Sequence, residues 1–295
     1  MPKLVYVSLL VTAACAAPPA LAQNDDFASV EITVHEVAEN LYYLEGRGGN
    51  IGVLTGEDGI VLIDDQFAPL TEKIIAAVES VSDGDILYLI NTHVHPDHTG
   101  GNENFGNLGV PILAHDNVRL RLSRGIRGGP PSPAAALPVI TYSESTTLFF
   151  NGEEIRIVKV PNAHTDGDSV IHFVNADVIH TGDVYRTTGY PRIDADNGGT
   201  AAGTIEALDA IIEMAGADTT ILPGHGVLAT RDDVQEFRDM VAQVYERVKP
   251  MVEQGMSLEQ VTAAAPTEDL DARWGDPAGF LPGLYQAIRN ELDAR

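Results

Sequence analysis

Alternating apolar and polar positions predict that the chain begins with a meander of short strands. Residues 30–34 alternate with the two-residue period of a half-buried strand. Three more strands are predicted from short apolar runs between Gly-rich or acidic turns, over residues 41–44, 51–54 and 60–63. The apolar positions of residues 69–80 have helical spacing, and residues 86–90 indicate a buried strand.

The second half of the chain repeats this layout without a literal sequence repeat. A hairpin is predicted around the Asn151-Gly152 turn, with strands at 147–150 and 154–160. The remaining strands are predicted at residues 110–114, 169–174, 178–181 and 219–222. Helices are predicted at residues 100–105, 116–123, 200–214, 232–253 and 281–292. Two packed sheets with helices on their outer faces would bury these apolar positions, which predicts an α/β sandwich.

A Gly- and Pro-rich segment interrupts this pattern between residues 125 and 138. It holds three Gly and four Pro, so we expect either a solvated connector or a mobile flap. The whole chain has 295 residues and an apolar fraction of 44%, enough for a sizeable core.

The N-terminal residues have the composition of an export signal. Lys3 supplies a positive charge, residues 4–17 an apolar core, and Ala20-Leu21-Ala22 a small-x-small cleavage site. We therefore expect a signal peptide at residues 1–22, a single domain with C-terminal helices at 23–295, and a periplasmic or secreted protein. A membrane anchor is the weaker alternative, because about 20 apolar residues are needed to span a bilayer.

The single cysteine and the net charge limit the anchors, ligands and binding partners that we expect. Cys15 is the only cysteine, and the sequence before it makes a poor lipid-attachment site, so lipid anchoring is not expected. Cleavage after Ala22 leaves no thiolate ligand and no disulfide. A net charge of −25 repels phosphate backbones, which argues against nucleic acid. No second long apolar run follows residue 22, so we expect no stable membrane insertion after signal removal.

The strongest chemical signal directly follows the predicted strand at 86–90. Residues 93–98 contain three of the nine histidines of the chain and one aspartate. His93 and His95 are two residues apart, so in an extended loop they point the same way and can share one ion. Asp97 and His98 must diverge from each other and are better placed for a second ion. A loop whose histidines only form hydrogen bonds is the alternative, but this density of ligands favours a metal site.

Three later turns each place one more candidate ligand just after a predicted strand. These residues are His164, Asp183 and His225. Glycines beside Asp183 and His225 allow the backbone to approach whatever those side chains bind. Each turn alone is a weak signal, whereas four strand-end turns that supply five His and two Asp are a strong one.

From about residue 30 to 245, the order and spacing of these residues resemble the metallo-β-lactamase superfamily. The likeness rests on Asp64, the HxHxDH motif at 93–98, His164, Asp183 and the Pro-Gly-His-Gly turn around His225. It implies a four-layer αβ/βα sandwich with a two-metal centre at one edge. The resemblance implies a first metal held by His93, His95 and His164, and a second held by Asp97, His98 and His225. It implies that Asp183 bridges both ions and that Asp64 braces the ligand loop from behind.

Position 183 departs from the typical β-lactamases of this fold that share the three-histidine site. Those enzymes carry a cysteine there, whereas an aspartate is similar to glyoxalase II and many broader hydrolases. Imidazole and carboxylate ligands suit Zn²⁺ and tolerate Fe or Mn. We expect two zinc ions, a hydroxide bridging them as nucleophile, and Asp97 orienting that nucleophile.

The same resemblance suggests residues that contact the substrate. Arg186 lies where a basic residue of lactamase relatives pairs with the substrate carboxylate, and Asn197 lies in a segment similar to the one that binds a carbonyl there. Tyr190 and Arg192 share the same loop. Ordinary loop surface is the alternative for all four.

The expected export of the protein favours some possible substrates over others, because they occur in different compartments. Glutathione thioesters form in the cytoplasm, whereas β-lactams act in the periplasm. We therefore expect an exported zinc hydrolase of an amide, ester or thioester carbonyl in a small molecule. Its leading activity would be β-lactam ring hydrolysis, with antibiotic resistance as the consequence. The alternatives are a thioesterase or lactonase of the glyoxalase II-like branch, and a non-enzymatic metal-binding module.

Overall fold

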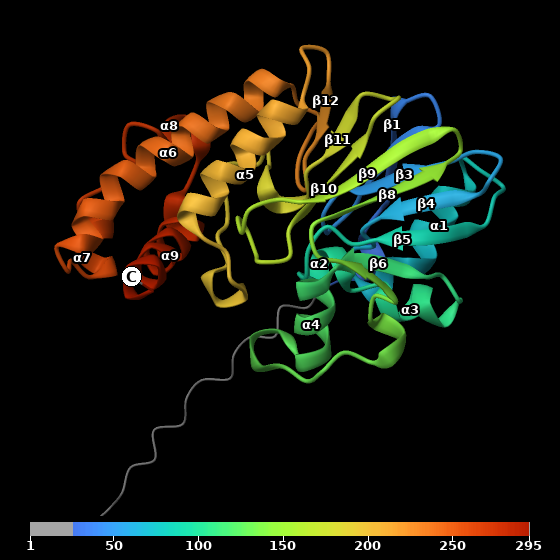
Figure 1. Cartoon of the computed structure of the whole chain (residues 1–295), viewed down its shortest axis with the longest axis horizontal. Helices are drawn as coiled ribbons and strands as arrows, with labels where there is room; N and C mark the ends of the chain where they lie inside the picture. Colours follow the sequence, from blue (N-terminus) through green and yellow to red (C-terminus); the bar gives the residue numbers. More distant parts are fainter. Residues whose placement is uncertain (1–25, 295) are drawn as a thin grey trace, which may run out of the picture.

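Two β-sheets lie face to face, with helices on both outer sides (Figure 1). The computed structural model describes residues 26–294, so the expected signal peptide and Cys15 lie outside it. The seven strands of the first sheet, in spatial order, are β1 (Thr33–Ala38), β2 (Leu41–Glu45), β3 (Ile51–Leu54), β4 (Ile60–Ile63), β5 (Ile86–Ile90), β6 (Ile112–His115) and β7 (Ile140–Tyr142). The second sheet has the order β12 (Thr220–Leu222), β11 (Val178–His180), β10 (Ser169–Phe173), β9 (Glu153–Lys159) and β8 (Ser145–Phe150).

The helices divide between the two outer layers. On the side of the first sheet are α1 (Thr71–Glu79), α2 (Pro96–Thr99), α3 (Asn102–Asn107) and α4 (Asp116–Arg124). On the side of the second sheet are α5 (Ala201–Met214), α6 (Arg231–Glu253), α7 (Leu258–Ala263), α8 (Asp271–Trp274) and α9 (Leu281–Asp293). Among the described residues, no helix combines the length and apolarity needed to cross a bilayer.

Alternation along the strands separates the apolar layers. In β4, Val61 and Ile63 face the second sheet, whereas Ile60 and Leu62 pack with Ile74 of α1. The central layer holds residues of both sheets, among them Leu41, Ile90, Ile157, Ile171 and Phe173. These layers confirm the predicted four-layer αβ/βα sandwich.

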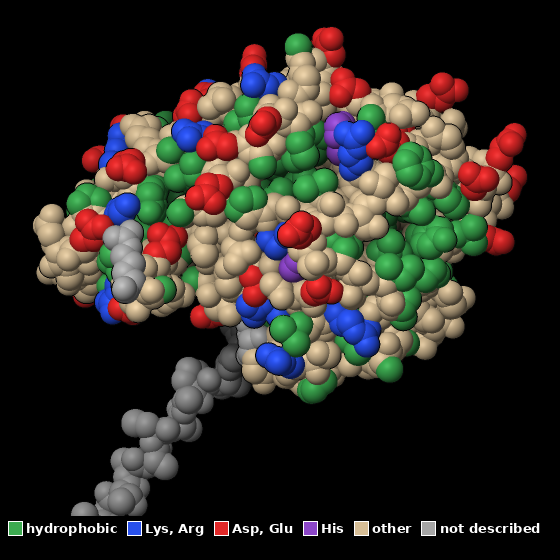
Figure 2. Space-filling view, in the orientation of Figure 1, with side chains coloured by type: hydrophobic (Ala, Val, Ile, Leu, Met, Phe, Trp, Pro, Cys, Tyr) green, Lys and Arg blue, Asp and Glu red, His purple; other side chains and the backbone are tan. Residues whose placement is uncertain are grey.

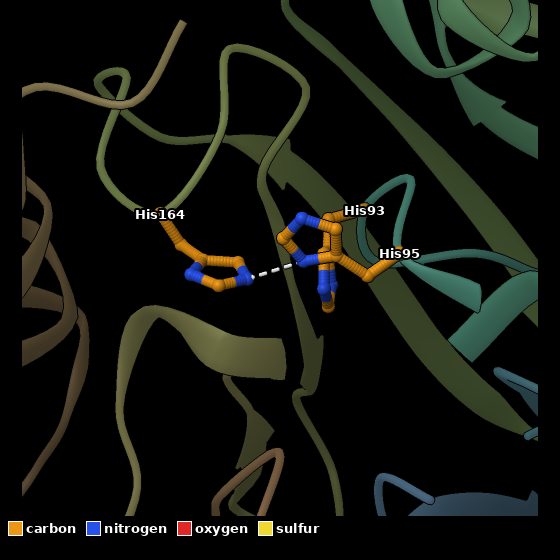
Figure 3. Close-up of side chains that lie close together, drawn as sticks. All are labelled: His93, His95 and His164. Atoms are coloured by element: carbon orange, nitrogen blue, oxygen red, sulfur yellow. Dashed lines mark hydrogen bonds between the residues drawn. The ribbon is translucent and has the colours of Figure 1, made fainter. Parts of the chain in front are cut away.

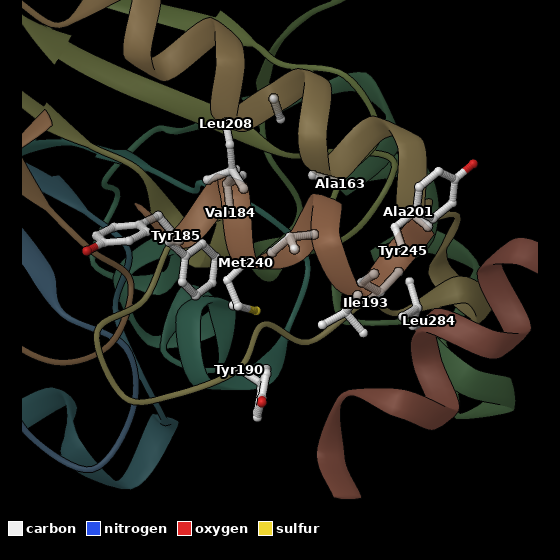
Figure 4. Close-up of a cluster of buried hydrophobic side chains, with 14 of the residues drawn as sticks. Ala163, Val184, Tyr185, Tyr190, Ile193, Ala201, Leu208, Met240, Tyr245 and Leu284 are labelled. Atoms are coloured by element: carbon white, nitrogen blue, oxygen red, sulfur yellow. The ribbon is translucent and has the colours of Figure 1, made fainter. Parts of the chain in front are cut away.

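The largest apolar cluster joins the second sheet to the C-terminal helices. Val170, Ile179 and Ile221 of the sheet share it with α5, α6 and α9, and part of it is drawn in Figure 4. Two labelled members, Tyr190 and Ile193, come from the loop between β11 and α5. The C-terminal helices therefore fix this loop as well as cover the sheet.

Most expected elements are present, with boundary shifts that pairing explains. The strand expected at 30–34 begins only at Thr33, which pairs with Glu45 at the end of β2. Before it, the carbonyls of Phe27, Ala28 and Val30 accept hydrogen bonds from the Lys73 ammonium. The Gly- and Pro-rich segment is a connector with two short 3₁₀ turns, Ile126–Gly128 and Ala134–Ala136. The strand β7 and the helices α7 and α8 were not predicted.

Candidate metal centre

The ligand loop follows β5, as the sequence predicts, but its second half is helical. His93 and His95 precede the single turn α2, which carries Asp97 and His98. Val94 between the two histidines points into an apolar cluster with Val118. Its neighbours therefore turn to the opposite side, and the rings of His93 and His95 lie 5.0 Å apart.

The ends of three other strands bring the remaining ligands to the same place. His164 follows β9, Asp183 lies in the turn Gly182–Val184 after β11, and His225 follows β12. Ligand atoms lie within 4.8 Å of one another in three overlapping sets: His93, His95 and His164; His93, His98 and Asp183; and Asp97, His98 and His225. We call the three histidines of the first set the first group, and Asp97, His98, Asp183 and His225 the second group. The structure thus gathers all seven candidate ligands at one edge of the sandwich.

In each of the three histidine rings of the first group, one nitrogen hydrogen-bonds to a neighbouring residue. This bond determines which nitrogen faces the centre of the group. His164 Nδ1 lies 2.7 Å from the carbonyl oxygen of Arg192 and must donate to it, which leaves Nε2 unprotonated in the neutral ring. The Thr92 hydroxyl donates to Asp64, so it accepts from His93 Nδ1 at 3.0 Å. His95 Nε2 lies 2.7 Å from an Asp194 carboxylate oxygen. Figure 3 shows the three rings converging.

These three rings present bare nitrogens to one point. Nδ1 of His95 and Nε2 of His164 are only 2.7 Å apart, and two lone pairs at that distance repel unless a cation or a proton lies against them. Nε2 of His93 is buried without a hydrogen-bond partner among residues 26–294. Burial lowers the pKa of the His93 ring well below its usual value, which keeps it neutral. Three imidazoles whose nitrogens converge on one point fit a zinc ion.

The second group is built around two histidines and two carboxylates. Nε2 of His98 and Nε2 of His225 are 3.4 Å apart, and Oδ2 of Asp97 lies 3.3 Å from the latter. Oδ1 of Asp183 lies 3.1 Å from His98 Nε2, and its Oδ2 lies 3.6 Å from His164 Nε2. Asp183 therefore reaches both groups, as expected of a bridging carboxylate.

In the second group, the histidines and carboxylates shift each other's pKa values in opposite directions. Burial lowers the pKa of His98, but the carboxylates of Asp183 and Asp64 outweigh it and raise that pKa well above its usual value. Burial raises the pKa of Asp183, but the charge of His98 and hydrogen bonds from the histidines outweigh it and lower the pKa. Asp97, His98, Asp183 and His225 could hold a divalent cation here, and its binding would require unprotonated histidines, so metal affinity would depend on pH.

Two glycines leave the space that these ligands occupy. A Cβ on Gly49 would lie 2.1 Å from Cε1 of His98, and a Cβ on Gly224 would lie 2.2 Å from Oδ1 of Asp183. Asn50, just before β3 of the first sheet, holds the turn that follows β12 of the second sheet. Its side-chain amide donates to the carbonyls of Pro223 and Gly226 at 2.9 Å. Close packing against the Asp183 carboxylate thus explains the glycine at position 224.

A cavity of about 520 Å³ opens over the ligands. Its lining includes the metal-centre residues His95, Asp97, His164, Asp183 and His225, the side chains of Arg186 and Arg192, the segment Ile193–Asp196, and Gly279, Pro282, Gly283 and Gln286 near the start of α9. The contribution of α9 was not predicted. The lining thus includes two arginines beside four carboxylates, those of Asp97, Asp183, Asp194 and Asp196. Acidic side chains are also spread over the face drawn in Figure 2.

Two of the four expected substrate contacts lie elsewhere. Tyr190 does not line this cavity; its ring stacks on Phe280, and its hydroxyl donates to Asp271 at 2.8 Å. Asn197 is only 3% exposed, and both ends of its amide are used by Asp194 and Arg121. Tertiary contacts thus engage these two side chains, whereas Arg186 and Arg192 keep positions where a substrate can reach them.

Sequence reasoning missed one residue that contacts a ligand from behind. Asp194 is 8% exposed and binds the far side of the His95 ring. No motif marks it, because it lies 99 residues from His95 in a loop without an alternating pattern. Asp64, in contrast, lies where expected: its carboxylate accepts hydrogen bonds from the Thr92 N–H and from His98.

Comparisons with known proteins agree with this geometry. The family model of the metallo-beta-lactamase superfamily matches residues 44–225. Hydroxyacylglutathione hydrolase of Rhodospirillum rubrum is 29% identical over 159 residues, which are 53% of this chain and 54% of that protein. The Gloeobacter violaceus protein of the same name is 28% identical over 131 residues, 44% of this chain and 46% of its own. The chain spans about half the length of these relatives.

Solved structures share the fold at low identity. A metallo-beta-lactamase from Pontibacter korlensis has a TM-score of 0.63 and 14% identity, covering 72% of this chain and 99% of its own. The sec-alkylsulfatase Pisa1 from Pseudomonas sp. has a TM-score of 0.68 and 19% identity, covering 88% of this chain and 50% of its own. These likenesses show the fold and leave the substrate to be argued from the site.

Proposed function

Because the chain belongs to the metallo-beta-lactamase superfamily, we propose that it is a metal-dependent hydrolase that cleaves the acyl bond of a small, carboxylate-bearing molecule. The first candidate substrate is a β-lactam ring. The observation that carries this proposal is the pair of arginines in the cavity directly above the two ligand groups. The similarity to hydrolases favours an enzyme over the alternative of a non-enzymatic metal-binding module.

Two zinc ions would be held by the two ligand groups, the first by His93, His95 and His164 and the second by Asp97, His98 and His225, with Asp183 within reach of both groups. When bound, they supply an activated water and polarise the scissile carbonyl. Asp97 lines the cavity and turns Oδ2 toward His225, so its other oxygen is available to orient the attacking water. His225 also lines the cavity.

The arginines support an anionic substrate. A backbone bridge holds Arg186 beside His225, and its Nε donates to the Thr188 hydroxyl at 2.8 Å. That hydrogen bond leaves the Nη groups of the guanidinium to bind a carboxylate, for which their planar fork is suited. Arg192 is exposed and can screen or bind the same group.

A thioester is the second candidate substrate. Two observations favour it: the curated relatives named above are hydroxyacylglutathione hydrolases, and an aspartate stands at position 183 where a cysteine would mark a dedicated β-lactamase. The expected export at residues 1–22 favours the β-lactam instead. We therefore propose a periplasmic or secreted enzyme, a proposal that rests on the N-terminal sequence pattern.

A hydrolysis panel tests the proposed reaction. It comprises a penicillin, a cephalosporin, a carbapenem, a lactone, a hydroxyacyl thioester and a secondary alkyl sulfate, each assayed with and without chelator. Chelator-sensitive turnover of a β-lactam supports the first candidate, and turnover of the thioester alone supports the second. Turnover of the sulfate alone, or of no acyl compound, would overturn the acyl-hydrolase proposal.

Cell fractionation tests the proposed location separately. The full chain and a variant that lacks residues 2–22 are expressed in a Gram-negative host and followed by immunoblot. We expect the full chain in the periplasmic fraction or the medium and the truncated chain in the cytoplasm. Equal distributions of the two proteins would contradict export.

A further inference from the structure

We propose that Asp194 is a positioning residue for the metal ligand His95, and that Asn197 and Arg121 hold Asp194 in place. None of the three is a candidate ligand. The inference rests on the metal site proposed above, but it concerns metal binding and ring orientation, not the substrate. It also gives Asn197 a different role from the substrate contact that the sequence suggested.

The bond between Asp194 and His95 fixes the state of the imidazole. Oδ2 of Asp194 lies 2.7 Å from Nε2 of His95, and the two side chains are 6% and 11% exposed. A carboxylate can only accept, so Nε2 carries the hydrogen and Nδ1 is left bare. Nδ1 is the nitrogen that faces His164 and the centre of the three-histidine group. Without this acceptor the ring could rotate or carry its hydrogen on Nδ1, and either change removes an electron pair from the metal site.

The carboxylate of Asp194 is itself held at both oxygens. Its Oδ1 accepts the backbone N–H of Asn197 at 3.1 Å, and its Oδ2 accepts the Asn197 amide at 2.8 Å. The backbone N–H of Asp194 donates to the carbonyl of His164 at 2.9 Å. Asp194 therefore ties the positions of two ligands of the same group together.

Arg121 of α4 determines which way the Asn197 amide points. Its Nη1 donates to Oδ1 of Asn197 at 3.0 Å, which forces the NH₂ group to face Asp194. Its Nε and Nη2 bind the two oxygens of Asp166 at 2.6 and 2.7 Å, a bidentate pair that fixes the guanidinium plane. A continuous chain of directed hydrogen bonds thus runs from helix α4 through Asn197 and Asp194 to His95.

Zinc titration of the zinc-free protein tests this series of hydrogen bonds. The variants are Asp194→Ala, Asn197→Ala, Arg121→Met and Arg121→Lys, and zinc affinity is measured by competition with a chromophoric chelator. Partners that orient a ligand typically change metal affinity by about 10–100-fold, which is the loss expected for Asp194→Ala. Asn197→Ala and Arg121→Met should show smaller losses of the same sign. Arg121→Lys should recover only part of the loss, because lysine cannot bind Asp166 and Asn197 with one planar group.

A second readout separates positioning from general stability. Long-range ¹H–¹⁵N spectra of the zinc-loaded protein report which nitrogen of His95 carries the hydrogen. We expect the Nε2–H form in the wild type and a mixture in Asp194→Ala. Glu153→Gln is the matched control, since Glu153 is also a buried carboxylate that accepts N–H groups, but it is the first residue of β9, where it accepts the backbone N–H groups of Asn175 and Ala176. It should lower stability and leave both readouts unchanged.

The proposal fails if folded Asp194→Ala binds zinc as tightly as the wild type and keeps His95 in the Nε2–H form. It also fails if Glu153→Gln lowers zinc affinity as much as Asp194→Ala does, because the effect would then be one of stability alone. Neither outcome depends on which substrate is hydrolysed, so failure here is distinguishable from failure of the acyl-hydrolase proposal.

Discussion

Asp64 and His98 form a fully buried hydrogen bond of 2.7 Å between Oδ2 and Nδ1, directly behind the second ligand group. The same carboxylate accepts the N–H and the hydroxyl of Thr92, so it is surrounded by donors. Asp64 also has a positive φ of 66°, a conformation that asparagine tolerates nearly as well. Position 64 therefore requires a carboxylate as hydrogen-bond acceptor more than it requires a residue that tolerates positive φ.

Replacing Asp64 with Asn should destabilise the zinc-free protein and weaken zinc binding. The new NH₂ group would face the donors of Thr92 and His98, and a buried unsatisfied donor costs about 1–3 kcal/mol. Misplacement of His98 should lower the affinity for the second zinc by about 10–100-fold. Urea unfolding and zinc titration measure the two effects. Asp83→Asn, at an exposed position, is the control and should change stability by less than about 0.5 kcal/mol.

Asp97→Asn should lower kcat far more than it raises KM. The substitution keeps the shape of the side chain but removes the oxygen that orients the attacking water, and loss of a positioned acid–base group typically costs about 10²–10⁴-fold in rate. Zinc content must be measured on the same sample, because Asp97 is also a candidate ligand. Near-full turnover in a zinc-loaded Asp97→Asn protein would contradict the role.

Arg186→Ala should raise KM for substrates with a carboxylate. A hydrogen bond to a charged group contributes about 1.5–3 kcal/mol, which corresponds to roughly 10- to 150-fold. Methyl esters of the same substrates lack the charge and serve as the control, so their KM should change little. Arg186→Lys should recover part of the affinity, because it keeps the charge but loses the bidentate fork. Equal KM changes for acid and ester would argue against the anchor.

The convergence of the candidate ligands could be predicted because its signal is local. Each ligand follows a short apolar run, and the HxHxDH spacing at 93–98 carries four of the seven within six residues. Strand ends in a two-sheet sandwich meet at one edge, so separate turns could be assigned to one site before any distance was known. The helix turn at α2 changed the loop's conformation but not which side chains converge.

The residues behind and above the ligands could not be predicted, because tertiary contacts assign their roles. Asn197 looked like a substrate contact in its loop, and only Arg121, 76 residues earlier, turns its amide toward Asp194. Tyr190 likewise is committed to Phe280 and Asp271 of the C-terminal region. The strand β7 has three residues and is defined by its pairing with β6. Its sequence has no alternation of apolar residues long enough to predict a strand.

Asp65 gives a prediction for the pH dependence of stability. It is fully buried, and although Oδ1 accepts the N–H of Gly101 at 2.9 Å, Oδ2 has no hydrogen-bond partner among residues 26–294. Burial raises its pKa well above the ordinary value of 3.8. The stability that the protonated form supports is therefore complete below about pH 3.8 and is lost as the pH rises through the folded-state pKa.

Asp65→Asn removes this titration, so its free energy of unfolding relative to the wild type should increase steadily as the pH rises from about 4. Any fixed cost of the amide shifts the whole curve without changing its slope, and the other titrating groups are common to both proteins and cancel. Urea unfolding of the two zinc-free proteins between pH 4 and pH 8 measures the difference at each pH. A difference that stays constant or falls across this range would show that Asp65 is ionised in the folded protein at the lowest pH, and that a partner for Oδ2 compensates its burial.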